Sequence, residues 1–164
     1  MIDLILLFVS GRGMELSELV TFNGRLLTFD DRTGIVFEIS NDMVSPWVIL
    51  TDGDGPSTKG FKSEWATVKD QMLYVGSMGK EWTNAAGTFE NYNPMFVKAI
   101  NIHGEVKTLN WVRNYKAIRS IVDIEWPGYL IHESGVWSSE NHQWVFLPRR
   151  CSKVNKLLNS LVNE

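Results

Sequence analysis

The sequence contains one β-hairpin pattern twice, and this repeat constrains the fold more than any other feature. The stretch SELVTFNGRLLTFDD begins at Ser17, and SEWATVKDQMLYVGS begins at Ser63, 46 residues later. Both copies open with Ser-Glu and place a polar pair at the bend, Asn23-Gly24 in the first copy and Lys69-Asp70 in the second. Asn-Gly favours a two-residue hairpin turn because both residues accept a positive φ. The repeat predicts two equivalent hairpins, each of which starts with a carboxylate.

Each predicted hairpin continues into a second pair of apolar, β-branched runs, so each copy predicts a four-stranded antiparallel unit. The predicted strands cover 19–22, 25–29, 34–40 and 46–50 in the first unit and 65–68, 72–76, 95–102 and 106–112 in the second. The Gly-rich stretch 51–60 separates the two units. A short helix is expected at 114–121.

A third hairpin is predicted at 134–139 and 143–148, and Glu133 precedes it as Glu64 precedes the second. Four-stranded units that recur every 40 to 70 residues, on the order of a propeller repeat, indicate the blades of a β-propeller. The first strand of each blade would line a central channel, so Glu18, Glu64 and Glu133 would face one axis. A two-sheet sandwich with these residues on exposed edges is the alternative.

The chain leaves each hairpin at the end where it entered, which predicts a rim of charged side chains around these carboxylates. This rim would contain Asp30, Asp31 and Arg32 after the first hairpin, Lys80 after the second, and Arg149 and Arg150 after the third. Convergent carboxylates repel one another and require a cation, and oxygen ligands suit Ca²⁺ or Mg²⁺. Guanidinium groups match phosphate geometry. The pattern predicts metal-assisted hydrolysis of phosphoanhydrides.

Composition and motifs exclude several other classes. The net charge of −3 gives no basic surface for nucleic acid, and a single cysteine, Cys151, cannot form an internal disulfide. The three histidines lack zinc-site spacing. An EF-hand that starts at Asp52 fails because Pro56 and Ser57 stand where an acid or amide and Gly are required. The sequence contains neither a P-loop nor a Gly-x-Ser-x-Gly motif.

Several stretches between Gly11 and Arg150 together resemble the calcium-activated nucleotidase, or apyrase, family. They are GRGMELSELVTFNGRLLTFDDRTG, PWVILTDGDG, KGFKSEWATVKDQMLYVG, GKEWT, NWVRNY, PGYLIHES and WVFLPRR. The resemblance implies an all-β, five-bladed β-propeller with one Ca²⁺ in its central tunnel. It implies the hydrolysis of nucleoside diphosphates, such as UDP and GDP, and of triphosphates, by an enzyme of the secretory pathway.

The resemblance also assigns roles to residues of this chain. The metal ligands would be Ser17, Glu18, Glu64 and Glu133, and the catalytic carboxylates would be Asp30, Asp31 and Glu64. The substrate-binding cations would be Arg32, Lys80, Arg149 and Arg150.

Members of this family are much longer than this chain, so the resemblance covers two blades and the inner hairpin of a third. We expect a partial propeller over 11–150 between a divergent apolar N-terminus at 1–10 and a divergent tail at 151–164. The run at 1–10 is interpreted as a buried strand, with a degenerate signal peptide as the alternative. Apolar residues at helical spacing in 154–161 predict a short amphipathic helix.

Two functions are compatible with these observations. The first is a calcium-dependent nucleoside diphosphatase. The second is an inactive remnant that binds only calcium or a protein partner, and in either case unpaired blade edges predict self-association.

Overall fold

The structure is a computed structural model that describes residues 14–153. These residues form an all-β fold with one α-helix, as the sequence predicts. The predictions for 1–10 and for a helix at 154–161 lie outside the described residues. Among residues 14–153 there is no helix of the length and apolar character needed to span a membrane.

The first predicted unit is a four-stranded antiparallel sheet with the order β1-β2-β3-β4. Its strands are β1 (Leu16–Phe22), β2 (Arg25–Asp30), β3 (Ile35–Ser40) and β4 (Met43–Ile49). Asn23 and Gly24 form the β1–β2 turn with φ values of 48° and 75°, so the predicted turn is confirmed. The predicted strand pairing of this unit is therefore confirmed.

The second unit is also a four-stranded antiparallel sheet, with the order β10-β9-β6-β5. Its strands are β5 (Trp65–Lys69), β6 (Met72–Gly76), β9 (Phe96–Ile100) and β10 (Val106–Asn110). The β5–β6 turn corrects the prediction by one residue. Asp70 and Gln71 have positive φ values of 49° and 59°, while Lys69 pairs with Met72 as the last ladder position. Counted from the Ser-Glu pair that opens each copy, the first ladder ends at Phe22 and Arg25, one residue earlier than the second.

The third hairpin forms a two-stranded sheet of β11 (Tyr129–Ser138) and β12 (Gln143–Ser152). Both strands are longer than predicted. The expected helix is α1 (Val112–Ser120). The sequence analysis did not predict the short pair β7 (Trp82–Thr83) and β8 (Phe89–Asn91) or the 3-10 helix η1 (Asn93–Met95).

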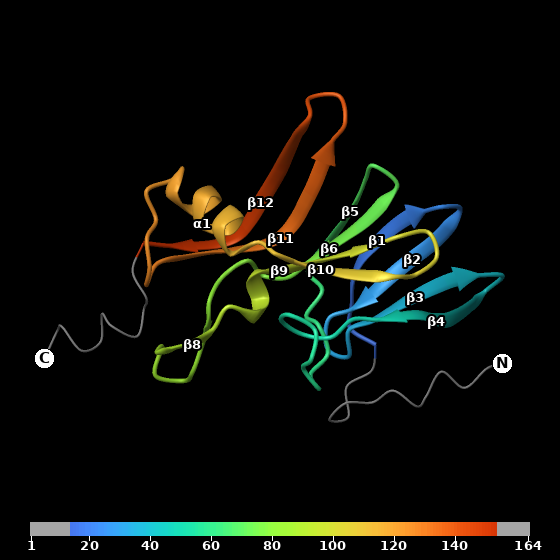
Figure 1. Cartoon of the computed structure of the whole chain (residues 1–164), viewed down its shortest axis with the longest axis horizontal. Helices are drawn as coiled ribbons and strands as arrows, with labels where there is room; N and C mark the ends of the chain where they lie inside the picture. The colour runs from blue at the N-terminus through green and yellow to red at the C-terminus, as the bar shows by residue number, and fades with distance from the viewer. Residues whose placement is uncertain (1–13, 154–164) are drawn as a thin grey trace, which may run out of the picture.

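The first strands of the three hairpins connect successive sheets. Between β1 and β5, the Ser17 hydroxyl donates to the Ser63 carbonyl at 2.6 Å. Between β5 and β11, the Trp137 amide donates to the Thr67 hydroxyl at 3.1 Å. Figure 1 shows the hairpins β1–β2, β5–β6 and β11–β12 following one another across the molecule. This succession is the one expected of propeller blades, but the sheets do not close a ring within residues 14–153, so the number of blades stays a prediction.

Two apolar clusters fill the spaces between these sheets. The first lies between the two four-stranded sheets and includes Phe29, Val36, Leu73 and Val75, which are all fully buried. The second is aromatic and joins the second sheet, α1 and the third hairpin. Its members are Trp65, Met95, Val97, Trp111 and Tyr115, with the partly buried Trp144 and Phe146 packed against them. Each buried large side chain contributes roughly 1.5–3 kcal/mol, so these clusters fix how the hairpins sit beside one another.

Trp65 lies at the centre of the aromatic cluster. Its ring is 5.4 Å from Phe146 and 6.0 Å from Trp111 between centroids, and its indole N–H donates to the Tyr115 hydroxyl at 3.2 Å. The ring lies directly over Gly76, its cross-strand partner, where a Cβ would come within 2.0 Å of the indole. Glycine at position 76 therefore provides the space that the indole occupies.

A buried ion pair anchors α1 to the segment that leads into β7. Arg119 NH1 and NH2 donate to the two carboxylate oxygens of Glu81 at 2.7 and 3.2 Å, and both side chains are almost fully buried. Arg119 also donates to the Gly128 carbonyl at 3.3 Å. This bidentate pair replaces the water that each charge loses on burial.

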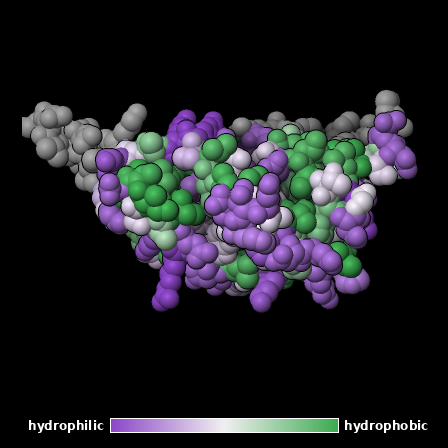
Figure 2. Space-filling model, turned by 90° about the horizontal axis from the view of Figure 1, so that it is seen from above, coloured by the Kyte–Doolittle hydropathy of each residue, from purple (hydrophilic) through white to green (hydrophobic). Residues whose placement is uncertain are grey.

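The surface seen from above carries separate apolar patches with a polar area between them (Figure 2). Large apolar residues with more than half of their surface exposed are Leu19, Met43, Ile49, Ile121 and Leu147. Leu147 belongs to β12, a strand that pairs on one side only within the described residues.

Candidate active site

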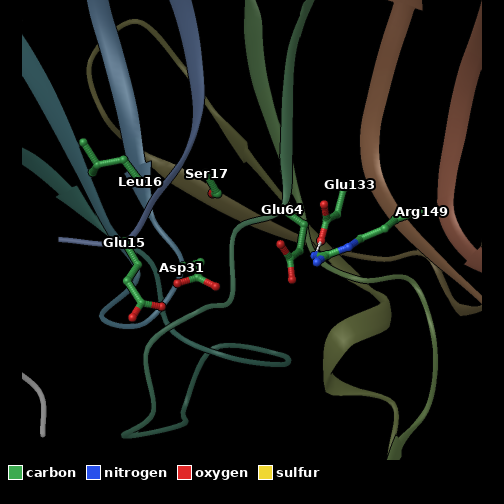
Figure 3. A pocket seen from close by; sticks show the side chains of 7 residues that line it. All are labelled: Glu15, Leu16, Ser17, Asp31, Glu64, Glu133 and Arg149. Atoms are coloured by element: carbon green, nitrogen blue, oxygen red, sulfur yellow. Dashed lines mark hydrogen bonds and ion pairs between the residues drawn. The ribbon is translucent and has the colours of Figure 1, made fainter. Parts of the chain in front are cut away.

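A cavity of about 270 Å³ lies where the three hairpins begin and end, and we call it the acidic cavity. Its lining residues are Glu15, Leu16, Ser17, Asp31, Glu64, Glu133 and Arg149. Figure 3 shows Asp31 and Glu64 pointing into a common space, with Glu133 and Arg149 side by side at one wall. Residues from all three hairpins therefore meet at one site, as the hairpin repeat predicts.

Ser17 and Glu18 lie in a bulge of β1, and their side chains have different surroundings. Leu16 pairs with Asp30 and Leu19 with Thr28, so β1 has one more residue than β2 between these pairs. Ser17 lines the acidic cavity. The Glu18 carboxylate instead accepts the amides of Leu19 at 2.9 Å and Ala66 at 3.4 Å, and Glu18 does not line the cavity.

The turn after β2 gives its two aspartates different environments. One carboxylate oxygen of the buried Asp30 accepts the amides of Arg32 at 2.8 Å and Thr33 at 3.3 Å, which stabilises the turn. Asp31 points into the acidic cavity, where its Oδ2 accepts from Lys62 Nζ at 2.5 Å. Asp31 Oδ1 is buried and has no hydrogen-bond partner among residues 14–153. The structure therefore leaves a buried acceptor at the cavity wall.

Lys62 lies between two carboxylates of the site. Its ammonium is 2.5 Å from Asp31 Oδ2 and 2.7 Å from Glu64 Oε1. Burial alone would lower the pKa of Lys62, but the hydrogen bonds to Asp31 and Glu64 outweigh burial and raise it. Burial raises the pKa of Glu64, Lys62 partly offsets this, and the charges of Glu133 and Asp31 raise it further. The proton affinity of Glu64 therefore depends on its burial and on Lys62, Glu133 and Asp31.

Glu133 and Arg149 form an ion pair across the β11–β12 hairpin, and this pair raises the pKa of Arg149. A second cavity of about 190 Å³ adjoins the acidic cavity and shares Glu64, Glu133 and Arg149 with it. Lys62 and Arg150 also line this second cavity. The two cavities together therefore bring three cations, Lys62, Arg149 and Arg150, close to the carboxylates of the site.

The structure brings together five of the residues selected from the sequence: Ser17, Asp31, Glu64, Glu133 and Arg149. Arg150 lines the adjoining cavity. Arg32 is 3.5 Å from Glu15, between Nε and Oε2, and reaches the site only through that residue. Asp30 and Glu18 are occupied by backbone amides, as described above.

Lys80 lies away from the acidic cavity, contrary to the sequence-based expectation of a shared rim. It lines a separate small cavity with Glu81, Thr83, Trp126, Pro127 and Tyr129. Its ammonium donates to the Glu81 carbonyl at 3.0 Å and lies 5.5 Å from the Tyr129 ring centroid. Burial lowers the pKa of Lys80, and Glu81 partly offsets this effect. Met78, two residues before Lys80, still lines the cavity that adjoins the acidic cavity, whereas Lys80 does not.

Sequence reasoning missed Glu15 and Lys62, which belong to the site. Glu15 precedes Ser17 by two residues, and Lys62 precedes Glu64 by two residues. Alternate residues of an extended chain share a face, so the period of two was a signal that could have identified both residues.

The Gly-rich loop at 51–60 does not contribute to the lining of the acidic cavity. The buried Lys98 donates to the Gly53 carbonyl at 2.7 Å and to the Thr108 hydroxyl at 3.1 Å. Burial lowers the pKa of Lys98 to about 8, against the opposing effect of Asp52 and Asp54. The Asp52 carboxylate accepts from the side-chain amide of Asn93 at 3.3 Å. These contacts give the loop a structural function.

The donors around the acidic cavity are of the type that binds Ca²⁺, since carboxylate and hydroxyl oxygens are its usual ligands. Asp31 Oδ1 in particular is buried and available. Within residues 14–153, no group of three or more His, Cys, Asp or Glu side chains is placed to hold a metal ion. Protein cations are bound to these carboxylates instead, Lys62 to Asp31 and Glu64, and Arg149 to Glu133.

Comparisons with known proteins match nearly the whole chain. The model of the family described as Apyrase matches residues 5–157. An apyrase of Cimex lectularius is 64% identical over 143 residues, which are 87% of this chain and 39% of that protein. Soluble calcium-activated nucleotidase 1 of Rattus norvegicus is 54% identical over 142 residues, which are 87% of this chain and 35% of that protein. Apyrase apy-1 of Caenorhabditis elegans is 51% identical over 142 residues and is covered over 40% of its length. The chain thus spans less than half the length of these relatives.

Proposed function

The chain belongs to the apyrase family, and from this we propose that it contributes the active-site face of a calcium-dependent nucleotide phosphohydrolase. The reaction would convert nucleoside diphosphates, UDP and GDP among them, and triphosphates to lower phosphates and inorganic phosphate. The acidic cavity supports this proposal, because it combines carboxylates with a guanidinium group in a chain of this family.

The observation that carries the proposal is the convergence of the three hairpins on one cavity. Asp31 comes from the first hairpin, Glu64 from the second, and Glu133 with Arg149 from the third. Carboxylates that meet in this way require positive charge, which a divalent cation supplies, and the phosphate oxygens of a nucleotide would bind that cation and the guanidinium group beside it. An ordinary surface ion pair can form within one hairpin, whereas this cavity is lined by residues from three.

Phosphate binding and proton transfer would fall to different residues of the site. Arg149, with Arg150 in the adjoining cavity, would bind the terminal phosphate, because a guanidinium donates two parallel hydrogen bonds to phosphate oxygens. A water molecule would attack the terminal phosphorus, and the bond to the bridging oxygen would break. The water proton would pass to Glu64, whose carboxylate lines the acidic cavity together with Arg149.

Calcium would be held by Asp31, Glu64, Glu133 and the Ser17 hydroxyl, with Glu18 as the remaining ligand that the resemblance assigns. When bound, the ion would neutralise the phosphate charge and polarise its oxygens. The name of the Rattus norvegicus relative describes that protein as calcium-activated. The same relationship underlies our proposals of a five-bladed propeller and of a location in the secretory pathway.

The test is phosphate release from UDP, GDP and UTP, measured with Ca²⁺, with Mg²⁺ and with a chelator. We expect release that depends on Ca²⁺ and falls by about 100-fold or more in Glu64→Gln, the typical minimum effect of removing a general base. Glu140→Gln, in the exposed loop of the third hairpin, is the matched control and should retain full activity. Equal rates with and without the chelator would refute calcium dependence, and an active Glu64→Gln would remove Glu64 from the reaction.

Binding without turnover is a second candidate. It is favoured by one observation, namely that Arg149, the proposed phosphate ligand, is already bound to Glu133. Calorimetry with Ca²⁺ that shows binding, combined with no phosphate release from any nucleotide, would support this second function over the first.

A further inference from the structure

Lys62 has a position in the site that none of the family-derived roles explains. Its ammonium bridges Asp31 and Glu64 at 2.5 and 2.7 Å. These two carboxylates are 16% and 9% exposed, whereas the lysine side chain is 30% exposed. The lysine therefore reaches inward from a more open position to two nearly buried acids.

The contacts of Lys62 are those of a counter-ion. Asp31 and Glu64 come from different hairpins; burial raises the pKa of Glu64, and the charges of Glu133 and Asp31 raise it further. An ammonium between them offsets this repulsion. It does so with a single charge, and Asp31 Oδ1 still lacks a hydrogen-bond partner among the described residues. Lys62 thus holds the two carboxylates together, but it neither neutralises both charges nor fills every hydrogen-bonding position of Asp31.

The surroundings of Lys62 also offer it a second position. Lys62 lines the adjoining cavity together with Arg149 and Arg150. The lysine stem has four rotatable carbons, and the ammonium is a mobile point charge rather than a fixed fork. Lys62 can leave the two acids without leaving the site.

We propose that Lys62 is a tethered counter-ion, which occupies the carboxylates of the acidic cavity in the metal-free chain and yields them to a divalent cation. This inference rests on the proposed function in that the cation is the proposed Ca²⁺. Lys62 thereby keeps Asp31 and Glu64 close together without metal and weakens the affinity of the site for metal.

The test compares Lys62→Met, which keeps the length of the side chain and removes the charge, with Lys62→Arg, which keeps the charge. Calorimetry measures Ca²⁺ affinity, and thermal melts measure stability with and without Ca²⁺. We expect Lys62→Met to bind Ca²⁺ about tenfold more tightly or better, because a competing charge in direct contact is gone. Lys62→Arg should bind no more tightly than the wild type. Lys107→Met, on the exposed face of β10, is the control and should leave the affinity unchanged.

The melts provide the second measurement. Without Ca²⁺, Lys62→Met should melt below the wild type, and Ca²⁺ should restore its melting temperature; a variant that folds only with Ca²⁺ would also support the proposal. Unchanged or weaker Ca²⁺ binding by Lys62→Met, failure to fold at any Ca²⁺ concentration while Lys62→Arg folds, or no Ca²⁺ binding by any form would overturn it. Phosphate release reports on the proposed function separately: tighter binding without hydrolysis retains the counter-ion role and removes only the enzymatic proposal.

Discussion

The buried pair of Arg119 and Glu81 gives the sharpest stability prediction. The two groups share two hydrogen bonds of 2.7 and 3.2 Å and have side-chain exposures of 4% and 3%. Arg119→Met would leave the Glu81 carboxylate buried without its partner. Breaking such a pair from one side costs about 3–5 kcal/mol, which corresponds to about 6–20 °C in melting temperature for a domain of this size.

The assay is a double-mutant cycle with urea unfolding and thermal melts. Arg119→Met and Glu81→Leu should each destabilise strongly, while the double variant should recover most of the loss, because no charge remains buried. Arg25→Met removes a partner from the more exposed Arg25–Glu38 pair and should cost about 1 kcal/mol or less. Losses that simply add in the double variant would refute the argument, because they would show that the two charges do not depend on each other.

Three further predictions concern the aromatic cluster and the site. Gly76→Ala should lower the free energy of unfolding by about 1–3 kcal/mol, since the new methyl would overlap the Trp65 indole. Urea unfolding measures this loss, and an unchanged urea midpoint would contradict the prediction. Burial lowers the pKa of His132 from 6.5 to about 4. Between pH 6.5 and 4, His132 is therefore protonated in the unfolded chain but stays neutral in the folded chain. The free energy of unfolding should fall by about 3 kcal/mol as the pH drops across this range. Urea unfolding across this range should show the slope in the wild type and a flatter profile in His132→Phe. Arg149→Lys should lower kcat/KM for UDP by about tenfold, because the planar fork is lost, without a change in melting temperature; equal kinetics would remove Arg149 from phosphate binding.

The strands and turns were predictable because their signals are local. Asn23-Gly24 accepts positive φ at both turn positions. In the strands on either side, alternate residues are apolar and lie on a face of the strand that is buried. The one-residue error at Lys69-Asp70 arose because polar residues fill all of 69–71, so the sequence has no glycine there to mark which two residues take a positive φ.

The site was predictable where hairpin geometry alone determined the position. Asp31, Glu64 and Arg149 lie at the ends of hairpin strands, so the return of the chain brings them together. Glu18 and Lys80 of the predicted site lie outside the lining of the acidic cavity. The Glu18 carboxylate accepts the Ala66 amide of β5, and the Lys80 ammonium donates to the Glu81 carbonyl, contacts that the strand pattern alone does not reveal. The roles assigned to these two residues stay predictions.

The junctions between the sheets have a consequence for how such a fold can vary. Successive sheets within residues 14–153 share no continuous backbone ladder; they meet through single contacts such as Ser17 to Ser63 and through interlocked aromatic rings. Backbone ladders fix the spacing of strands at about 4.8 Å, whereas side-chain contacts have no fixed spacing. The volume of a few residues such as Trp65 and Phe146 therefore sets the angle from one sheet to the next. Substitutions at these junctions could change the curvature of the whole assembly by small steps while every hairpin keeps its own register.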